Sequence, residues 1–248
     1  MSGKKSFGRF FTENAVVIIF LLVTVAAIPP SGLSLQYILQ EMITRLGRNT
    51  FLVLALLLPI YAGMGLNFGM TLGAMSGQIG LILAINWNIG GVEGLAFAAL
   101  LGTPVSIMMG YICGAVLNKA KGREMVTGFM LAFFINGIYQ LVVLYMMGAV
   151  FPIKSPAILL SRGYGIRNTL NLEGVRQSLD NLLMAKVFGF NLPMATFLVI
   201  AVLCLFVVWF KKTKLGQDLR AVGHDMAVAE SAGVPVDRTR IIAIIIST

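Results

Sequence analysis

The chain contains few of the side chains that carry out catalysis or bind metal ions. Among its 248 residues are two cysteines and one histidine, and charged residues make up 12%. Cys113 and Cys204 lie in apolar segments without partners at ligand spacing, so the sequence predicts neither a disulfide framework nor a metal site. His224 has no companion for catalysis or metal binding nearby, and we interpret it as a capping or water-facing residue.

Motifs for nucleotide chemistry and covalent catalysis are also missing. No G-x-x-x-x-G-K-[ST] phosphate loop occurs, which excludes ATP binding by that route. The sequence has no nucleophile elbow, no paired zinc histidines and no intramembrane carboxylate pair. We therefore expect no catalytic residues and no cofactor bound by this chain, which disfavours an enzyme.

Apolar residues, by contrast, make up 58% of the chain, and the mean hydropathy is +0.88. A soluble core does not need this much apolar surface, so we expect an integral membrane protein. The basic start of the chain lacks a small-residue cleavage pattern, and we interpret the first apolar segment as a retained span. The sequence predicts an all-α, polytopic transmembrane helical bundle that forms a single domain over residues 1–248. The predicted spans are 15–30, 50–67, 70–87, 94–117, 125–151 and 194–210, with a further one beginning at Ile241.

Basic residues predict the orientation of these spans. Nineteen Lys and Arg against ten Asp and Glu give a formal net charge of +9, which in a membrane protein orients spans rather than binding nucleic acid. If each segment crosses once, three basic clusters fall on one side, and the positive-inside rule makes this side the cytoplasm of a plasma-membrane protein, with the N-terminus inside. One crossing more or fewer between residues 31 and 93 stays open. The clusters are Lys4, Lys5 and Arg9, then Lys119, Lys121 and Arg123, then Lys211, Lys212 and Lys214.

A glycine-rich stretch covers residues 63–80. Some of its glycines recur every four residues, which favours close helix crossing, and glycine also permits a break within a span. We therefore expect broken, closely packed spans here. The glycines with this pattern are Gly63, Gly65, Gly69, Gly73 and Gly77.

Neutral polar side chains fall in or near the apolar segments. Amides and hydroxyls in hydrocarbon need partners, which either a neighbouring helix or a polar solute in a transport pathway supplies. Both interpretations stay open, and a neutral pathway favours a sugar or nucleoside over an amino acid. Glu93 and Glu124 lie at span ends, where we expect both to be exposed. The candidate pathway residues are Asn67, Thr71, Gln78, Asn86, Asn136 and Gln140.

The charged stretch KKTKLGQDLRAVGHDMAVAESAGVPVDRTR, residues 211–240, interrupts two apolar runs. Asp225 is suited to cap the start of a helix, and Gly233 is suited to the left-handed position after its end. The sequence thus predicts a short helix over residues 226–232. A helix of this length is marginal in water, so we expect it to pack against another surface.

This stretch resembles the cytoplasmic loop of permease subunits of bacterial ABC importers, in the group that carries simple sugars, nucleosides and branched-chain amino acids. That group has a Thr-x-x-Gly-x-x-x-Arg-Ala-Val-Gly core followed by an Ala-rich helix, a glycine, an aliphatic residue and a basic residue. The matching residues are Thr213, Gly216, Arg220, Ala221, Val222, Gly223, Ala227, Ala229, Gly233, Val234, Val236 and Arg238.

A second match lies at residues 75–87, MSGQIGLILAINW. Sugar permeases of this group often have Thr-Gly-Gly-Ile-Asp-Leu-Ser-Val-Gly at this place. Gly77, Ile79 and Leu81 fit the passage. Gly80 stands where the aspartate is usual, so the resemblance does not extend to a ribose-type specificity.

The resemblance implies the permease subunit of an ATP-driven importer. Such a subunit forms half of a pathway with an identical or related second permease, while separate ATP-binding subunits hydrolyse ATP with Mg²⁺ and an extracytoplasmic binding protein delivers the solute. Family members are longer, so further spans are expected after Thr248. Residues 211–240 would be the cytoplasmic coupling loop, with small residues that allow close approach and polar residues at the rim. The coupling residues implied are Gly216, Arg220, Ala221, Gly223, Asp225, Ala229, Glu230 and Gly233.

Two other classes stay open. An ion-coupled secondary transporter is expected to show intramembrane ionisable groups, which are scarce in this sequence. A membrane-embedded enzyme needs a reactive constellation facing a cavity, and none is evident. The polar stretch at residues 152–193 is expected on the outer side, with a surface helix around residues 172–184.

Overall fold

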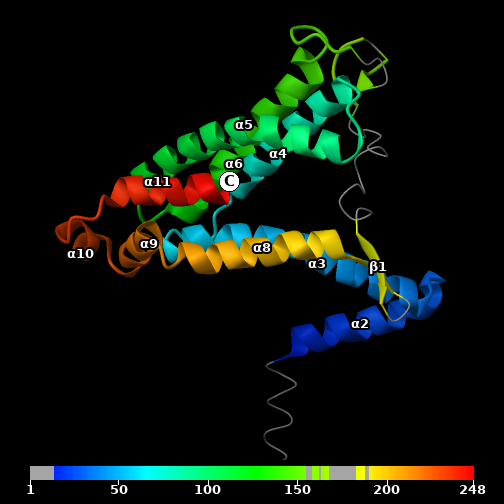
Figure 1. Ribbon diagram of the computed structural model, residues 1–248, viewed down its shortest axis with the longest axis horizontal. Coiled ribbons are helices and arrows are strands. Elements are labelled where there is room, and N and C mark those ends of the chain that lie inside the picture. The colour runs from blue at the N-terminus through cyan, green and yellow to red at the C-terminus, as the bar shows by residue number, and fades with distance from the viewer. Residues whose placement is uncertain (1–13, 155–157, 162, 168–182, 188–189) are drawn as a thin grey trace, which may run out of the picture. The chain divides into compact units, whose positions relative to one another are not determined.

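Helices make up nearly all the regular structure among the residues that the structure describes, as the sequence predicts (Figure 1). The exception is a hairpin of β1 (Met184–Val187) and β2 (Phe190–Pro193). Most of the surface helix expected around residues 172–184 lies outside the described residues, and its last residue belongs to β1. The computed structural model describes residues 14–154, 158–161, 163–167, 183–187 and 190–248.

The chain forms two compact units, which we describe separately. The first comprises residues 1–46 and 186–192, and the second comprises residues 47–185 and 193–248.

The first unit contains α2 (Ala15–Ser31) and the start of α3 (Leu35–Tyr61). α2 is apolar on all sides and has no buried residue, as suits a helix surrounded by lipid. It ends where Gly32 adopts a left-handed conformation with φ +66°. The first turns of α3 are polar, and Arg45 Nε donates to Glu41 Oε1 at 2.8 Å one turn away. These polar turns explain why α3 begins well before the apolar run predicted at residue 50.

The second unit is a helical bundle. α4 and α5 pack together along much of their length, α11 packs against α5, and α6 contacts both α4 and α5 (Figure 1). The helices of this unit after α3 are α4 (Met70–Asn86), α5 (Gly91–Lys119), α6 (Glu124–Leu141) with its π-helical continuation η1 (Val142–Met146), α8 (Met194–Phe210), α9 (Lys214–His224), α10 (Met226–Ser231) and α11 (Val236–Ser247).

Glycines make the closest helix contacts of this bundle. A Cβ at Gly80 of α4 would overlap the carbonyl of Ala98 in α5. A Cβ at Gly114 of α5 would come within 3.1 Å of the Ile241 Cα in α11. Only residues without a side chain let backbones approach this far, so the close crossing expected from the glycine-rich stretch is present.

The break expected in the glycine-rich stretch separates α3 from α4. Gly63 and Gly65 lie in this connection with φ of +71° and +69°, a region that residues with a Cβ rarely adopt. The chain therefore changes direction before α4 begins at Met70.

A buried apolar cluster joins most helices of the second unit. Cys113 is completely buried within it, where its side chain packs as a small apolar group. The buried members are Leu58, Ala62, Met64, Leu72, Cys113, Leu117, Phe210, Leu219, Ala243 and Ile244.

Three helices among the described residues are long and apolar enough to cross a membrane: Leu35–Tyr61, Gly91–Lys119 and Glu124–Met146. α8 and α9 form a fourth candidate that is bent by 74° at the break between them. α2 and α4 are shorter apolar helices of 17 residues each. The chain is thus an integral membrane protein, as its composition predicts.

Candidate functional site

The loop at residues 211–240 begins with a sharp turn between α8 and α9. The Thr213 hydroxyl donates to the Phe210 carbonyl at 2.6 Å and accepts from the Gly216 amide at 3.3 Å, which caps α9. A Cβ at Gly216 would overlap the carbonyl of Phe210. Gly216 is therefore needed for the close packing of the turn, because it is buried against the end of α8.

α9 is an amphipathic helix that the sequence analysis did not predict. Leu219 and Val222 are buried, at 1% and 2% exposure, whereas Arg220 and His224 are exposed. The spacing of Leu215, Leu219 and Val222 at i, i+4 and i+7 after a threonine cap would have indicated it.

α10 matches the short helix predicted in the loop, and it ends one residue early. Asp225 Oδ1 accepts from the amides of Ala227 and Val228 at 2.8 and 3.1 Å, and Gly233 has φ +83°. The predicted caps at both ends are therefore confirmed.

One side of α10 packs against the chain's own helices. Ala229 is 3% exposed and forms a buried cluster with Val222 of α9 and Val236 of α11, against which Val234 also packs. This cluster supplies part of the packing surface that a helix of six residues needs.

The other side of α9 and α10 is exposed. Val228 and Met226 are exposed at 63% and 36%, and the charged side chains of Arg220 and Glu230 form no ion pair in the described part of the chain. Asp225 and Gly233 are also exposed. We define the α9–α10 surface by the exposed residues Arg220, Ala221, Met226, Val228 and Glu230.

Gly223 connects this loop to the break between α3 and α4. A Cβ at Gly223 would overlap the carbonyl of Tyr61 and would lie 3.1 Å from the Gly63 amide. Lys211 strengthens the same contact region, since its Nζ lies 4.3 Å from the centre of the Tyr61 ring. The end of α9 and the α8–α9 turn are thus both fixed against the end of α3.

Arg240 was not singled out from the sequence, yet it is the largest fully buried side chain described. It is 1% exposed, and its Nη2 donates to Glu124 Oε1 at 2.5 Å. The expectation that Glu124 is exposed is wrong, because this side chain is only 11% exposed and is held by Arg240. Glu93 is exposed as expected.

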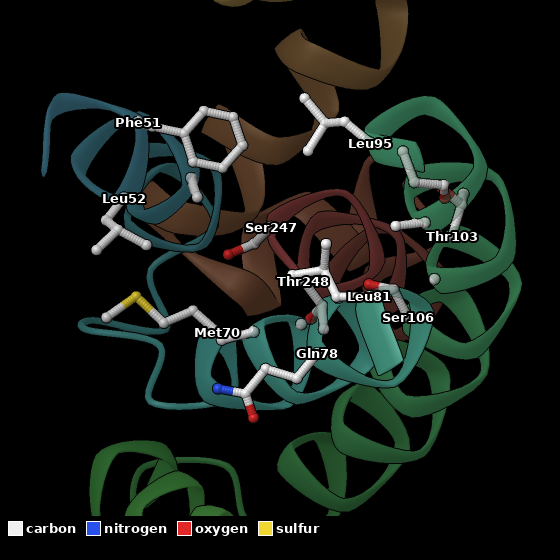
Figure 2. A pocket seen from close by; sticks show the side chains of 17 residues that line it. Phe51, Leu52, Met70, Gln78, Leu81, Leu95, Thr103, Ser106, Ser247 and Thr248 are labelled. Atoms are coloured by element: carbon white, nitrogen blue, oxygen red, sulfur yellow. The ribbon is translucent and has the colours of Figure 1, made fainter. Parts of the chain in front are cut away.

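A cavity of about 450 Å³ lies between α3, α4, α5 and the end of α11. Phe51 and Leu52 line one side and Thr103 of α5 the other, with Ser247 and Thr248 between them (Figure 2). The lining is mainly apolar and includes no charged side chain. Its polar side chains are Gln78, Thr103, Ser106, Ser247 and Thr248.

Among the six candidate pathway residues, Gln78 lines this cavity, and its side chain is exposed. Asn67 lies beside it and is 3% exposed; its Nδ2 donates to Ser247 Oγ at 3.2 Å and its Oδ1 accepts from the Gly69 amide at 2.8 Å. Asn67 therefore links the start of α4 to α11.

The other four candidates lie outside the lining of this cavity. The Thr71 hydroxyl donates to the Phe68 carbonyl at 2.9 Å, and Asn86 Oδ1 accepts from the Lys154 amide at 2.7 Å. Asn136 and Gln140 lie on α6, where Gln140 is exposed. Thr71 and Asn86 thus use hydrogen bonds within the protein, although neither partner lies on a neighbouring helix, because Phe68 lies just before α4 and Lys154 lies in a bend after η1.

Comparison with known proteins relates the chain to transport permeases. A family model described as branched-chain amino acid transport system / permease component matches residues 38–248. The autoinducer 2 import system permease protein LsrD of Photorhabdus luminescens is 26% identical over 241 residues, which cover 94% of this chain and 62% of that protein. LsrD proteins of Photorhabdus laumondii subsp. laumondii and Photorhabdus temperata are 26% and 22% identical over 182 residues, 73% of this chain and 46% of each protein. The chain therefore spans less than two thirds of the length of these relatives, and no solved structure shows a significant match to it.

Proposed function

Since the chain belongs to the family described as the permease component of branched-chain amino acid transport systems, we propose that it forms the transmembrane pathway of an ATP-driven ABC importer. In this proposal ATP and Mg²⁺ bind to separate ATP-binding subunits. A second permease, identical or related, completes the pathway, and an extracytoplasmic binding protein delivers the solute. The chain lies in the plasma membrane with its N-terminus in the cytoplasm.

The observation that carries the proposal is the α9–α10 surface. α10 is capped at both ends, and it is held from behind by Ala229. Met226 and Val228 are exposed apolar side chains of α10, and Arg220 of α9 and Glu230 of α10 are exposed charged residues. A protein interface also combines apolar and charged side chains, and the family implies an ATP-binding subunit as the partner.

Docking alone does not drive import. The ATP-binding subunit must interact differently with the two conformations of the pathway for ATP hydrolysis to favour one of them. The contacts of Gly223 with residues 61–63 provide a physical connection from α9 to the break before α4. α4 in turn lines the cavity of about 450 Å³.

We propose that this cavity receives a small, neutral, polar solute of sugar type. The Gln78 amide offers both a donor and an acceptor, and the hydroxyls of Thr103 and Ser106 add acceptors without a fixed charge. Autoinducer 2 is the first solute to test because relatives 22–26% identical are named as its import permeases. A nucleoside is the second.

The substitution Arg220→Glu tests the proposed docking. It reverses an exposed charge on the α9–α10 surface, so we expect the amount of ATP-binding subunit that co-purifies with the full-length permease, and solute-stimulated ATP hydrolysis, to fall at least fivefold. The matched control Glu93→Lys reverses an exposed charge at the start of α5 and should leave both unchanged. A complex in which Arg220→Glu binds and stimulates the ATP-binding subunit like the unmodified chain would contradict this role of the surface.

A further inference from the structure

One buried guanidinium connects the first residues of two helices. Arg240, in the second turn of α11, donates from Nη2 to Glu124 Oε1 at 2.5 Å and from Nη1 to Met226 Sδ at 3.6 Å. Glu124 is the first residue of α6, and Met226 is the first residue of α10. Arg240 therefore contacts both the proposed docking helix and the start of a membrane span.

We infer that the Arg240–Glu124 pair is a positioning pair that carries a displacement of α10 to α6. The inference rests on the proposed function, in which the ATP-binding subunit moves α10. α6 packs against α4 and α5, and these two helices line the solute cavity. A shift of α6 would thus reach the walls of the cavity by direct contact.

Stability alone does not account for this pair. Burying two charges removes their hydration, and replacing a buried ion pair with apolar residues of similar volume is often neutral or stabilising. Arg240 Nε is also buried without a hydrogen-bond partner in the described part of the chain, so the guanidinium is incompletely satisfied in this arrangement. The pair instead fixes the relative position of the two side chains, because the planar guanidinium of an arginine restricts the direction from which a carboxylate binds.

The start of α6 has room to shift. A cavity of about 430 Å³ lies beside it. Gly122, just before α6, has φ +84°, and a Cβ there would have no neighbour within 4 Å. The connection into α6 is therefore not fixed by packing at this glycine, which leaves the ion pair as a specific contact at its start. The cavity is lined by Gly63, Met64, Gly65, Gly122, Arg123, Glu124, Met125, Val126 and Thr127.

A second ion pair supplies a matched control. Lys121 Nζ and Asp237 Oδ1 are 2.8 Å apart and join the same two segments, the approach to α6 and the first turn of α11. Both side chains are exposed, at 44% and 67%, and the pair does not involve α10. An exposed pair of this kind contributes little to the relative positions of helices.

The experiment follows the movement of α10 and α6 separately. The full-length permease is purified with its ATP-binding subunits after the exposed Cys204 is replaced by serine, while the buried Cys113 is kept. A fluorescent maleimide is attached to Ser231→Cys on α10 or to Val126→Cys on α6, both exposed positions outside the α9–α10 surface. ATP with vanadate is the probe, so no transported solute is needed.

In the parent chain we expect both labels to respond to ATP with vanadate. In the double variant Glu124→Leu/Arg240→Met, which removes both charges and keeps an apolar volume, the label at position 231 should respond as before while the response at position 126 falls at least fivefold. The control Lys121→Ala/Asp237→Ala should retain both responses.

An unreduced response at position 126 in the double variant would overturn the inference. A parent chain whose label at position 231 does not respond contradicts the proposed function instead, so the two failures are distinguishable. If the double variant is not recovered from the membrane, Glu124→Gln is measured in its place, and the same fall or retention at position 126 decides the inference.

Discussion

Gly223 allows two backbone segments of the chain to pack closely, because it has no side chain. Its Cα faces the backbone of residues 61–63 so closely that a Cβ would overlap the Tyr61 carbonyl. The neighbouring atoms belong to backbone, which yields less readily than the end of a flexible side chain. Gly216 is in the same situation against Phe210. Both glycines therefore hold the loop to the membrane helices, and the exposed residues between them are left for a partner.

The substitution Gly223→Ala tests this close approach. We expect a loss of about 1–3 kcal/mol in the free energy of unfolding, because one added carbon forces the end of α9 away from α3. Thermal unfolding in mild detergent measures it. Gly137→Ala is the control: it lies exposed in α6 with no atom within 4 Å of its Cβ, and alanine there should stabilise the helix by up to about 1 kcal/mol. Equal stability of the two variants would show that the contact at Gly223 is not close in solution.

At the scale of the elements, α10 is a short helix held by its caps. It has six residues, and Ala229 is the one buried residue among them. So short a helix gains little from its own hydrogen bonds, and Asp225 satisfies two of the amides at its start. The shape of the α9–α10 surface thus depends on a single carboxylate.

Removing that carboxylate should loosen α10 without disturbing the bundle. Asp225→Ala is expected to cost about 0.5–2 kcal/mol in local stability and to speed hydrogen exchange of the amides of residues 226–231. The amount of ATP-binding subunit that co-purifies should fall with it. Asp225→Asn keeps a capping oxygen and should remain close to the unmodified chain. Unchanged exchange in Asp225→Ala would mean that α10 is held by packing alone.

The elements also show what the sequence could and could not predict. Capping residues made α10 predictable to within one residue, and apolar runs located α5 and the helix formed by α6 and η1, because both signals are local. The apolar run at residue 50 did not predict the start of α3 at Leu35, because the first turns of this helix contain polar residues. α9 was not predicted because the prediction relied on apolar runs. The charged residues of α9 interrupt such a run around Leu219 and Val222. The sequence could not predict which surface packs against Gly216 or Gly223. A glycine allows close approach of an external partner and of the chain's own backbone equally well. The pairing of Arg240 with Glu124 joins residues 116 positions apart, a distance that no local pattern encodes.

For the whole molecule, the cavity proposed to receive the solute and the α9–α10 surface are separate features of the second unit. The cavity is lined by α3, α4, α5 and α11, whereas the surface belongs to α9 and α10. The proposed transport requires both, but each should be removable while the other remains. This separation allows binding of the ATP-binding subunit and passage of solute to be measured independently.

Filling the cavity should block passage and leave docking intact. Gly77 lines it, and a Cβ there would meet no atom within 4 Å, so the side chain of Gly77→Leu would enter empty space. We expect solute uptake by the reconstituted complex to fall at least tenfold, with the ATP-binding subunit still bound. Gly137→Leu places the same side chain at an exposed position on α6 and should leave uptake unchanged. Normal uptake by Gly77→Leu would show that the solute does not use this cavity.

The 74° bend between α8 and α9 has a consequence for how deep the protein lies in lipid. When α8 crosses the bilayer, α9 must run nearly along its surface, and the three lysines around the turn, Lys211, Lys212 and Lys214, come to the level of the phosphate headgroups. Anionic lipids would attract this corner and hold it at a constant height. The turn would thereby hold α10 just outside the membrane, within reach of a soluble protein.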